Sequence, residues 1–218
     1  MSQSANLLIK NGTVVDGTGG PPYRADVRLR DGLIAEIGDQ LPAEGEPVFD
    51  ASDCYVTPGF IESHTHYDGA MWWDDRLDPL PGYGATTQVM GNCGFATAPI
   101  SDDEAARREV VKIFSFFEDI PEEPFIEALP WNWRSWPEYK ESMVTNCRVP
   151  LNYGVYCGHI ALRLAAMGLE AWDRAATPEE IGHMAGMLDE AMQAGAMVLA
   201  SNLMDHDGED RPVPSLKA

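Results

Sequence analysis

From residue 56 onward, short apolar runs alternate with stretches of helical periodicity, and this alternation restricts the fold more than any other feature. The runs predict buried strands at residues 59–63, 86–90, 151–156 and 197–201. Helices are expected between them at residues 102–117, 137–146, 160–167 and 178–194. Strands that alternate with helices pair in parallel, with the helices as crossovers. The pattern therefore predicts an α/β fold with about four βα units over residues 56–218.

Two of these helices carry start signals. Thr177, followed by a proline and then by Glu180, forms an N-cap with a capping box, and Gly195 is placed to end that helix. Ser101 is expected to cap the helix over 102–117. Residues 121–136, rich in proline and tryptophan, are expected to be irregular.

The first 55 residues have a different pattern, short strands separated by turns. An Asn-Gly pair at residues 11–12 and an Asp-Gly pair at residues 31–32 are both typical of hairpin turns. We therefore expect a small antiparallel β-sandwich module over residues 1–55. A module of about 50 residues buries little core, so this one is expected to be incomplete and to need further strands.

Polar residues follow each predicted strand of the α/β region. His64 and His66 follow the first strand, Cys93 the second, His159 the third and Asn202 the fourth. In sheets built from parallel strands, the chemistry lies at the carboxyl ends of the strands. These positions therefore predict one site at one edge of the sheet.

The two histidines and the cysteine predict a metal site. If the strand continues through them, His64 and His66 point to one side and Thr65 to the other. Cys93 stands in Gly-Asn-Cys-Gly, where flanking glycines allow a close approach of the backbone. Two imidazoles and a thiolate form the borderline-soft donor set that zinc prefers. We therefore expect His64, His66 and Cys93 to bind zinc.

Each candidate also has a structural interpretation. Cys93 is alternatively a buried thiol, and His159 alternatively a packing residue or a support for the ligands. Asp68 either orients an imidazole or belongs to a turn. Arg163 lies one helical turn after His159 and either binds a carboxylate or lies on the surface.

Other candidates have weaker support. His183 is expected on a solvated helix face and His206 in an acidic loop. Trp131, Trp133 and Trp136 form a cluster that suits core packing, with the wall of a substrate pocket as the alternative.

The composition limits which partners the protein is expected to bind and in which cellular compartment it is expected. The formal charge of −20, from 15 basic and 35 acidic residues, argues against nucleic acid and anionic membranes. No apolar run reaches the roughly 18 residues of a membrane span, and the first residues do not resemble a signal peptide, so a cytoplasmic protein is expected. The four cysteines show no CxxC spacing and are expected as free thiols or as a metal ligand.

Several sequence motifs resemble those of a known protein family. Pro-Gly-Phe-Ile-Glu-Ser-His-Thr-His-Tyr-Asp at residues 58–68 is similar to the first barrel strand of the amidohydrolase superfamily. Gly-Ala-Thr-Thr-Gln-Val-Met-Gly-Asn-Cys-Gly at residues 84–94 resembles the N-acyl-D-amino-acid deacylase (D-aminoacylase) branch, which uses a cysteine as metal ligand. Further similar motifs are Val-Val-Asp-Gly-Thr-Gly at 14–19, Pro-Trp-Asn-Trp at 130–133 and Gly-His-Ile-Ala-Leu-Arg at 158–163.

The resemblance implies a (β/α)₈ barrel with a small β-sandwich, a zinc cofactor, and hydrolysis of the amide bond of N-acyl-D-amino acids. By position, His64, His66 and Cys93 are the implied metal ligands, with Asp68, His159 and Arg163 as substrate-binding or supporting candidates. The 163 residues from 56 to 218 fall short of the roughly 250 that a whole barrel needs. The resemblance therefore implies an N-terminal half of the barrel, with the proton-transferring aspartate expected beyond Ala218.

Three functions follow as hypotheses. The first is a zinc-dependent deacylase of N-acyl-D-amino acids, of which this chain is a partial form. The second is a non-catalytic half-barrel, completed by a second chain or by a C-terminal half. The third is a hydrolase of cyclic amides, similar to hydantoinases or dihydroorotases, and Cys93 in its Gly-Asn-Cys-Gly context argues against this third hypothesis.

Overall fold

The computed structural model describes residues 6–203, 206 and 210–214 of the 218-residue chain. The chain divides into two compact units, one ending at Gly59 and the other beginning at Phe60. Among the described residues, no helix is both long and apolar enough to span a membrane.

The smaller unit is a single five-stranded sheet whose strand order is β3-β2-β1-β4, with β5 also paired to β1. Its strands are β1 (Leu7–Val14), β2 (Tyr23–Arg30), β3 (Leu33–Gly38), β4 (Val48–Asp50) and β5 (Tyr55–Val56). Strands β1, β2 and β3 are antiparallel, but β4 and β5 each run parallel to β1. The expectation of a purely antiparallel module is therefore wrong, because returning connections bring β4 and β5 alongside β1 in the same direction.

The hairpin expected at residues 11–12 is also wrong. Strand β1 continues through Asn11 and pairs with β2 on both sides of an irregularity between Ile9 and Gly12. Asn11 has a φ of 62°, and its N–H donates to the Asp26 carboxylate at 2.8 Å. A residue at positive φ produces a bulge as readily as a turn. The hairpin expected at residues 31–32 does join β2 to β3.

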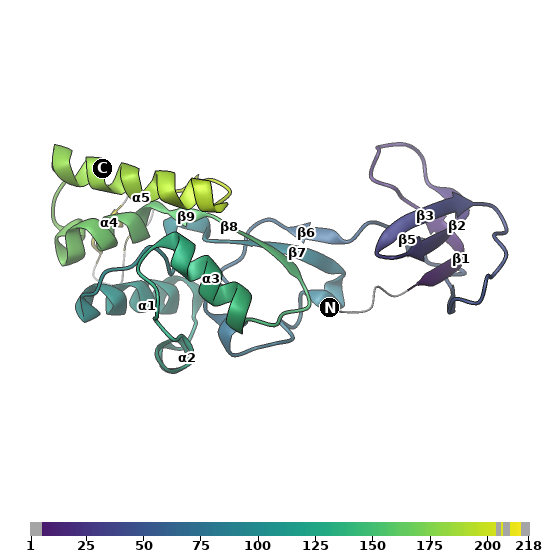
Figure 1. Cartoon of the computed structure of the whole chain (residues 1–218), viewed down its shortest axis with the longest axis horizontal. Helices are drawn as coiled ribbons and strands as arrows, with labels where there is room; N and C mark the ends of the chain where they lie inside the picture. The colour runs from purple at the N-terminus through teal and green to yellow at the C-terminus, as the bar shows by residue number, and fades with distance from the viewer. Residues whose placement is uncertain (1–5, 204–205, 207–209, 215–218) are drawn as a thin grey trace. The chain divides into compact units, whose positions relative to one another are not determined.

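The larger unit contains two sets of parallel strands. Strands β6 (Phe60–Glu62), β7 (Ala85–Met90) and β8 (Asn152–Val155) form one sheet, and β9 (Cys157–Gly158) pairs with β10 (Leu199–Ala200). All four expected strand positions are therefore strands, with the third one interrupted at Tyr156. Figure 1 shows α4 and α5 on one side of β9 and α1 with α2 on the other. Among the described residues these strands do not close into a barrel.

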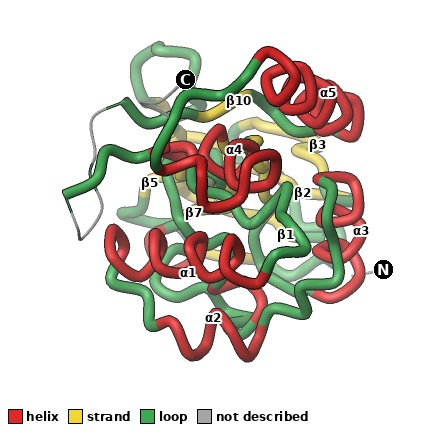
Figure 2. The backbone as a smooth tube through the Cα atoms, turned by 90° about the vertical axis from the view of Figure 1, so that its left-hand side faces the viewer, coloured by secondary structure: helices red, strands yellow, loops and turns green. Residues whose placement is uncertain are grey.

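Within the part of the chain that the structure describes, five α-helices accompany the strands. They are α1 (Glu104–Glu118), α2 (Glu122–Ala128), α3 (Trp136–Asn146), α4 (His159–Met167) and α5 (Pro178–Ala194). Helix α5 begins at the predicted cap, where Thr177 and Glu180 form a capping box, and ends at Gly195. Figure 2 shows α5 beside both α3 and α4.

Two expectations about the helices need correction. The N-cap of α1 is Asp103, whose carboxylate accepts from Ala105 N–H, and Ser101 instead accepts from Asp103 N–H. Helix α2 lies inside the stretch expected to be irregular. Its first turn carries two glutamates, which favour a helix N-terminus, and Phe125 buries its ring in the core.

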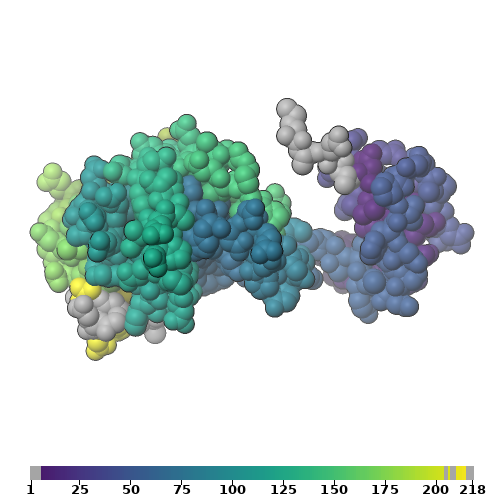
Figure 3. Space-filling view, turned by 90° about the horizontal axis from the view of Figure 1, so that it is seen from below, coloured from purple at the N-terminus to yellow at the C-terminus, as the bar shows by residue number. Residues whose placement is uncertain are grey.

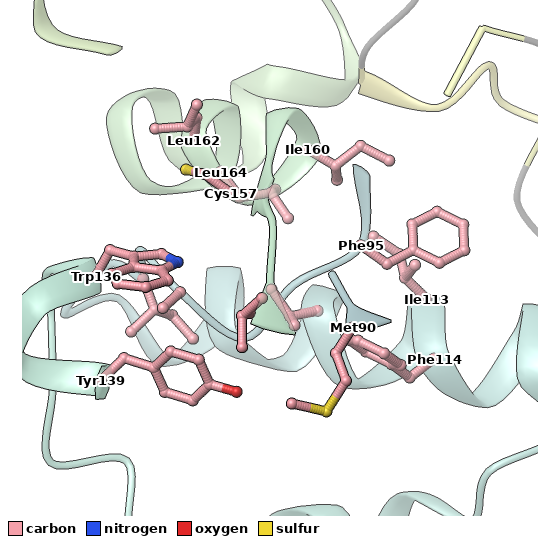
Figure 4. Close-up of a cluster of buried hydrophobic side chains, with 14 of the residues drawn as sticks. Met90, Phe95, Ile113, Phe114, Trp136, Tyr139, Cys157, Ile160, Leu162 and Leu164 are labelled. Carbon is pink, nitrogen blue, oxygen red and sulfur yellow. The ribbon is translucent and has the colours of Figure 1, made fainter. Parts of the chain in front are cut away.

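The core of the larger unit collects side chains from α1, α3, α4 and the strands. Figure 4 shows Met90 beside Phe114 of α1, with Tyr139 of α3 in the same cluster. Trp133 is 1% exposed and lies with its ring centroid 5.2 Å from that of Trp72. The tryptophan cluster is thus core, as expected. Figure 3 shows the residues of α1 to α3, in teal and green, covering much of the face turned to the viewer.

Candidate metal centre

The two candidate histidines lie just beyond a strand rather than within it, because β6 ends at Glu62. Thr65, between them, is buried, and both its N–H and its hydroxyl donate to the carbonyl of Val89 at the end of β7, at 3.0 and 2.8 Å. With Thr65 fixed against β7, the rings of His64 and His66 lie close together, with centroids 5.3 Å apart. The sequence predicts that Thr65 points away from the side of the two histidines. Its hydrogen bonds to β7, rather than the pleat of a strand, hold it in place.

The loop after β7 carries Cys93, and several of its residues have left-handed backbone conformations. Gly91, Cys93 and Gly94 have φ values of 76°, 54° and 76°. Asn92 is buried, and its amide donates to the carbonyls of Val89 at 2.9 Å and of Thr65 at 3.3 Å. Asn92 thus ties the cysteine loop to the histidine loop. Sequence reasoning did not single it out, although it stands in the Gly-Asn-Cys-Gly motif.

Together the two loops bring three potential ligands to one point. The ligand atoms of His64, His66 and Cys93 all lie within 4.8 Å of one another, and Cys93 Sγ is 3.2 Å from His64 Nε2. Two imidazole nitrogens and a sulfur are the donors that suit zinc. His64 is exposed while the other two are half-buried, so the cluster has an open side. The residues present therefore fit a zinc ion.

The electrostatics of the cluster favour an imidazole that can bind metal. Burial, with a smaller contribution from His64, lowers the pKa of His66 to about 4. His66 is therefore neutral near pH 7, which is the form that donates a lone pair to a metal. Its Nε2 lies 3.4 Å from Oε1 of Glu118, the last residue of α1, a contact that the sequence did not predict.

A family model described as "Amidohydrolase family" matches residues 47–211. This chain belongs to the amidohydrolase family. Among curated relatives, the N-acyl-D-aspartate deacylase of Alcaligenes xylosoxydans xylosoxydans is 37% identical over 192 residues, which cover 88% of this chain and 35% of that enzyme.

Two solved structures are also similar. A D-aminoacylase studied for its binuclear metal centre superposes with a TM-score of 0.76 and 28% identity, over 97% of this chain and 40% of that one. The N-acyl-D-glutamate deacylase of Bordetella bronchiseptica, solved with zinc and a phosphonate inhibitor, gives 0.72 and 32%, over 92% of this chain and 39% of that one. The chain thus resembles the D-aminoacylase branch, and it spans 35 to 40% of the length of these relatives.

Asp68 is fully buried and joins the two loops. One carboxylate oxygen accepts the N–H of Gly91 at 3.3 Å, and the other has no hydrogen-bond partner among the described residues. Burial raises the pKa of Asp68 to about 7, and the nearby charge of Glu118 adds to this effect. Its side-chain hydrogen bond is therefore to the backbone that leads to Cys93.

His159 and Arg163 lie on α4, outside the cluster of three ligands found among the described residues. Burial, and then the charge of Arg163, lower the pKa of His159. Arg163 is completely buried, and its Nη2 donates to the carbonyls of Ala171 at 3.3 Å and Arg174 at 2.8 Å. Arg163 is therefore not a surface arginine.

The structure also places the other residues that the sequence singled out. Asn202 is buried, with its backbone near Gly94, whereas His183 is exposed on α5 as expected. His206 is exposed and forms an isolated bridge with Pro212, and its neighbours at 205 and 207–209 lie outside the described residues. No disulfide links the described cysteines, as expected. Burial raises the pKa of Cys147 to about 11 and that of Cys157 to about 12.

Gly91→Ala is expected to destabilise the protein by about 1–3 kcal/mol, the range for a strained backbone residue. Gly91 has positive φ, and an added Cβ would lie 2.6 Å from the carbonyl oxygen of Tyr156. Urea denaturation measures the change. Gly182→Ala is the matched control, because a Cβ at Gly182 of α5 meets nothing within 4 Å and alanine favours a helix. Equal stability of the two variants would contradict the assigned role of Gly91.

Proposed function

We propose that this chain forms the metal-binding part of a zinc-dependent deacylase of N-acyl-D-amino acids. The observation that carries the proposal is the convergence of His64, His66 and Cys93, whose ligand atoms lie within 4.8 Å of one another. Relatives named for the deacylation of N-acyl-D-aspartate and N-acyl-D-glutamate support this substrate class. The proposed substrate is therefore a small N-acyl amino acid of D configuration.

We also propose how the chain is organised around this function. Residues 56–218 constitute the first half of a (β/α)₈ barrel, and residues 1–55 belong to a β-sandwich module. The four parallel strand positions and the superposition on part of a D-aminoacylase support this organisation. In such a barrel the ligands follow the carboxyl ends of the strands, as the two ligand loops do after β6 and β7.

The residues of this chain have distinct roles in the proposed site. A zinc ion held by these residues would supply Lewis-acid polarisation of the scissile carbonyl and a bound water of lowered pKa. His64 and His66 would supply nitrogen ligands, and Cys93 would supply a sulfur that is softer than the carboxylates found at many hydrolytic sites. Thr65 and Asn92 hold the two loops together, so that the three ligand atoms are already close before an ion binds.

The test is an assay of the complete gene product for release of the free amino acid. N-acetyl-D-aspartate, N-acetyl-D-glutamate and N-acetyl-D-leucine are compared with their L enantiomers, and with hydantoin and dihydroorotate. We expect turnover of the D substrates, its loss with a chelator, and recovery on addition of zinc. Turnover of the cyclic amides without turnover of the N-acyl-D-amino acids would overturn the proposed function.

A further inference from the structure

Arg163 of α4 is a charged side chain with no exposed surface. The guanidinium group of an arginine carries N–H donors on all three of its nitrogens. Nη2 of Arg163 donates to the carbonyls of Ala171 and Arg174. Nε and Nη1 are also buried, and neither has a hydrogen-bond partner among the described residues. A buried donor without a partner lowers the stability of the fold, and the cost is larger when the group is charged.

The acidic side chains closest to this arginine are held by a different arginine. Glu170 and Glu180 each form an ion pair with Arg174, at N–O distances of 2.6 and 2.7 Å. Burial, and then the positive charge of Arg174, lower the pKa of Arg163, and the attraction of Glu180 does not reverse this effect. Arg163 therefore has unused donors and a charge that favours an additional anion.

A cavity of about 280 Å³ lies beside Arg163, lined by residues of α4, α5 and β10. Figure 2 shows the two helices side by side. Apart from Arg163 and His159, the lining side chains are apolar, among them Leu162, Ile181 and Leu188. Small-molecule sites in proteins begin at about 300 Å³ and combine apolar walls with a few polar groups. The cavity thus has the size and the lining of a site for a small ligand.

The lining also indicates the chemical class of that ligand. A carboxylate has about four acceptor positions and no donor, so it suits a guanidinium with unused N–H groups, and hydrogen bonds between charged partners are the stronger kind. A phosphate or sulfate would turn several of its oxygens toward apolar side chains, which carries a desolvation cost. An aliphatic group attached to the carboxylate would instead pack against these walls.

Access to Arg163 requires a small movement of the cavity wall, because the arginine itself has no exposed surface. Ile181 lines the cavity and is 55% exposed, so one part of the lining meets solvent. Met184 also lines the cavity and is 8% exposed. Methionine is unbranched and has three rotatable bonds, so its side chain adapts readily to a ligand. We therefore expect a ligand to enter beside Ile181 and to reach the guanidinium as the Met184 side chain adjusts.

We propose that the cavity beside Arg163 binds a carboxylate carried on a short aliphatic group, with unused N–H groups of the guanidinium as donors. The carboxylate belongs either to a small monocarboxylic acid or to an acidic side chain of the complete gene product, and the two sources share this chemistry. The inference does not depend on zinc, because neither Arg163 nor His159 belongs to the cluster of three candidate metal ligands among the described residues.

Three variants of the chain test the proposal. Arg163→Met removes the donors but keeps a long unbranched side chain. Ala185→Leu keeps Arg163 and adds bulk to the cavity wall, on a helix that tolerates both residues. Arg148→Met is the matched control, because Nη1 of Arg148 also donates to two carbonyls but the residue is exposed. Circular dichroism checks that each variant is folded.

The probe is hexanoate, compared with hexanamide, which has nearly the same shape but no charge. Binding to the metal-free protein is measured by isothermal titration calorimetry, and ¹H–¹⁵N NMR follows the Nε–H resonance of Arg163. We expect hexanoate to bind the wild type and Arg148→Met alike and to shift that resonance, with hexanamide weaker by about tenfold or more. Arg163→Met and Ala185→Leu should each weaken hexanoate binding by about tenfold or more.

The same titration of the complete gene product distinguishes the two sources of the carboxylate. If both proteins bind hexanoate, the ligand is a small monocarboxylic acid, and if only the 218-residue chain binds it, an acidic side chain of the complete product fills the cavity. The proposal is overturned if the 218-residue chain does not bind hexanoate, if it binds hexanamide equally well, or if folded Arg163→Met binds like the wild type. Because the protein is free of metal, none of these outcomes depends on the proposed function.

Discussion

Cys93→Ala is expected to weaken zinc binding by more than about 100-fold. The sulfur of Cys93 lies 3.2 Å from His64 Nε2 and is one of three converging ligand atoms. Residues that merely support a ligand change metal affinity by about 10- to 100-fold, and removal of a ligand costs more than removal of its support. The measurement is zinc competition with a chelator, together with Co²⁺ substitution, which gives a thiolate charge-transfer absorption only if a cysteine binds the metal.

Cys54→Ala is the matched control for Cys93→Ala. Cys54 is an exposed cysteine of the smaller unit, so its removal changes the thiol count without changing the proposed site. We expect this control to bind zinc and to show the Co²⁺ absorption like the wild type. If Cys93→Ala kept both properties, the sulfur of Cys93 would not be a ligand, and the zinc site would have to lie elsewhere.

Local structure that depends only on residues close together in the sequence was predictable. Helix α5 starts and stops where Thr177, Glu180 and Gly195 predict, because caps act within one turn of the helix end. The Asn-Gly pair at residues 11–12 shows the limit of such reasoning. Its positive φ is correctly expected, but whether it makes a turn or a bulge depends on Asp26, which lies on the next strand.

The residues of the candidate site also differ in how far the sequence predicts them. His64, His66 and Cys93 were predictable as a group, because parallel strands bring their carboxyl ends to one edge and the residue types suit zinc. Glu118 was not predictable, because its approach to His66 depends on where helix α1 packs and ends. Asn92 likewise acts through Thr65, and such contacts between loops leave no periodic signal in the sequence.

Trp133→Ala is expected to destabilise the larger unit by about 3–5 kcal/mol, the usual cost of removing a large aromatic side chain from a core. Trp133 is 1% exposed, packs against Trp72 and Tyr139, and donates its indole N–H to the carbonyl of Thr97 at 2.8 Å. Alanine would leave a cavity and an unpaired buried carbonyl, each of which carries its own cost. Urea denaturation followed by far-UV circular dichroism measures the loss.

Trp133→Phe separates the two contributions, because phenylalanine keeps an aromatic ring between Trp72 and Tyr139 but cannot donate to Thr97. We expect this variant to lose less stability than Trp133→Ala, with a loss that includes about 1–3 kcal/mol for the unsatisfied carbonyl. Equal losses in the two variants would assign the whole effect to the hydrogen bond. If Trp133→Ala were as stable as the wild type, the tryptophan cluster would not be the core on which α3 packs, and its alternative as the wall of a substrate pocket would regain support.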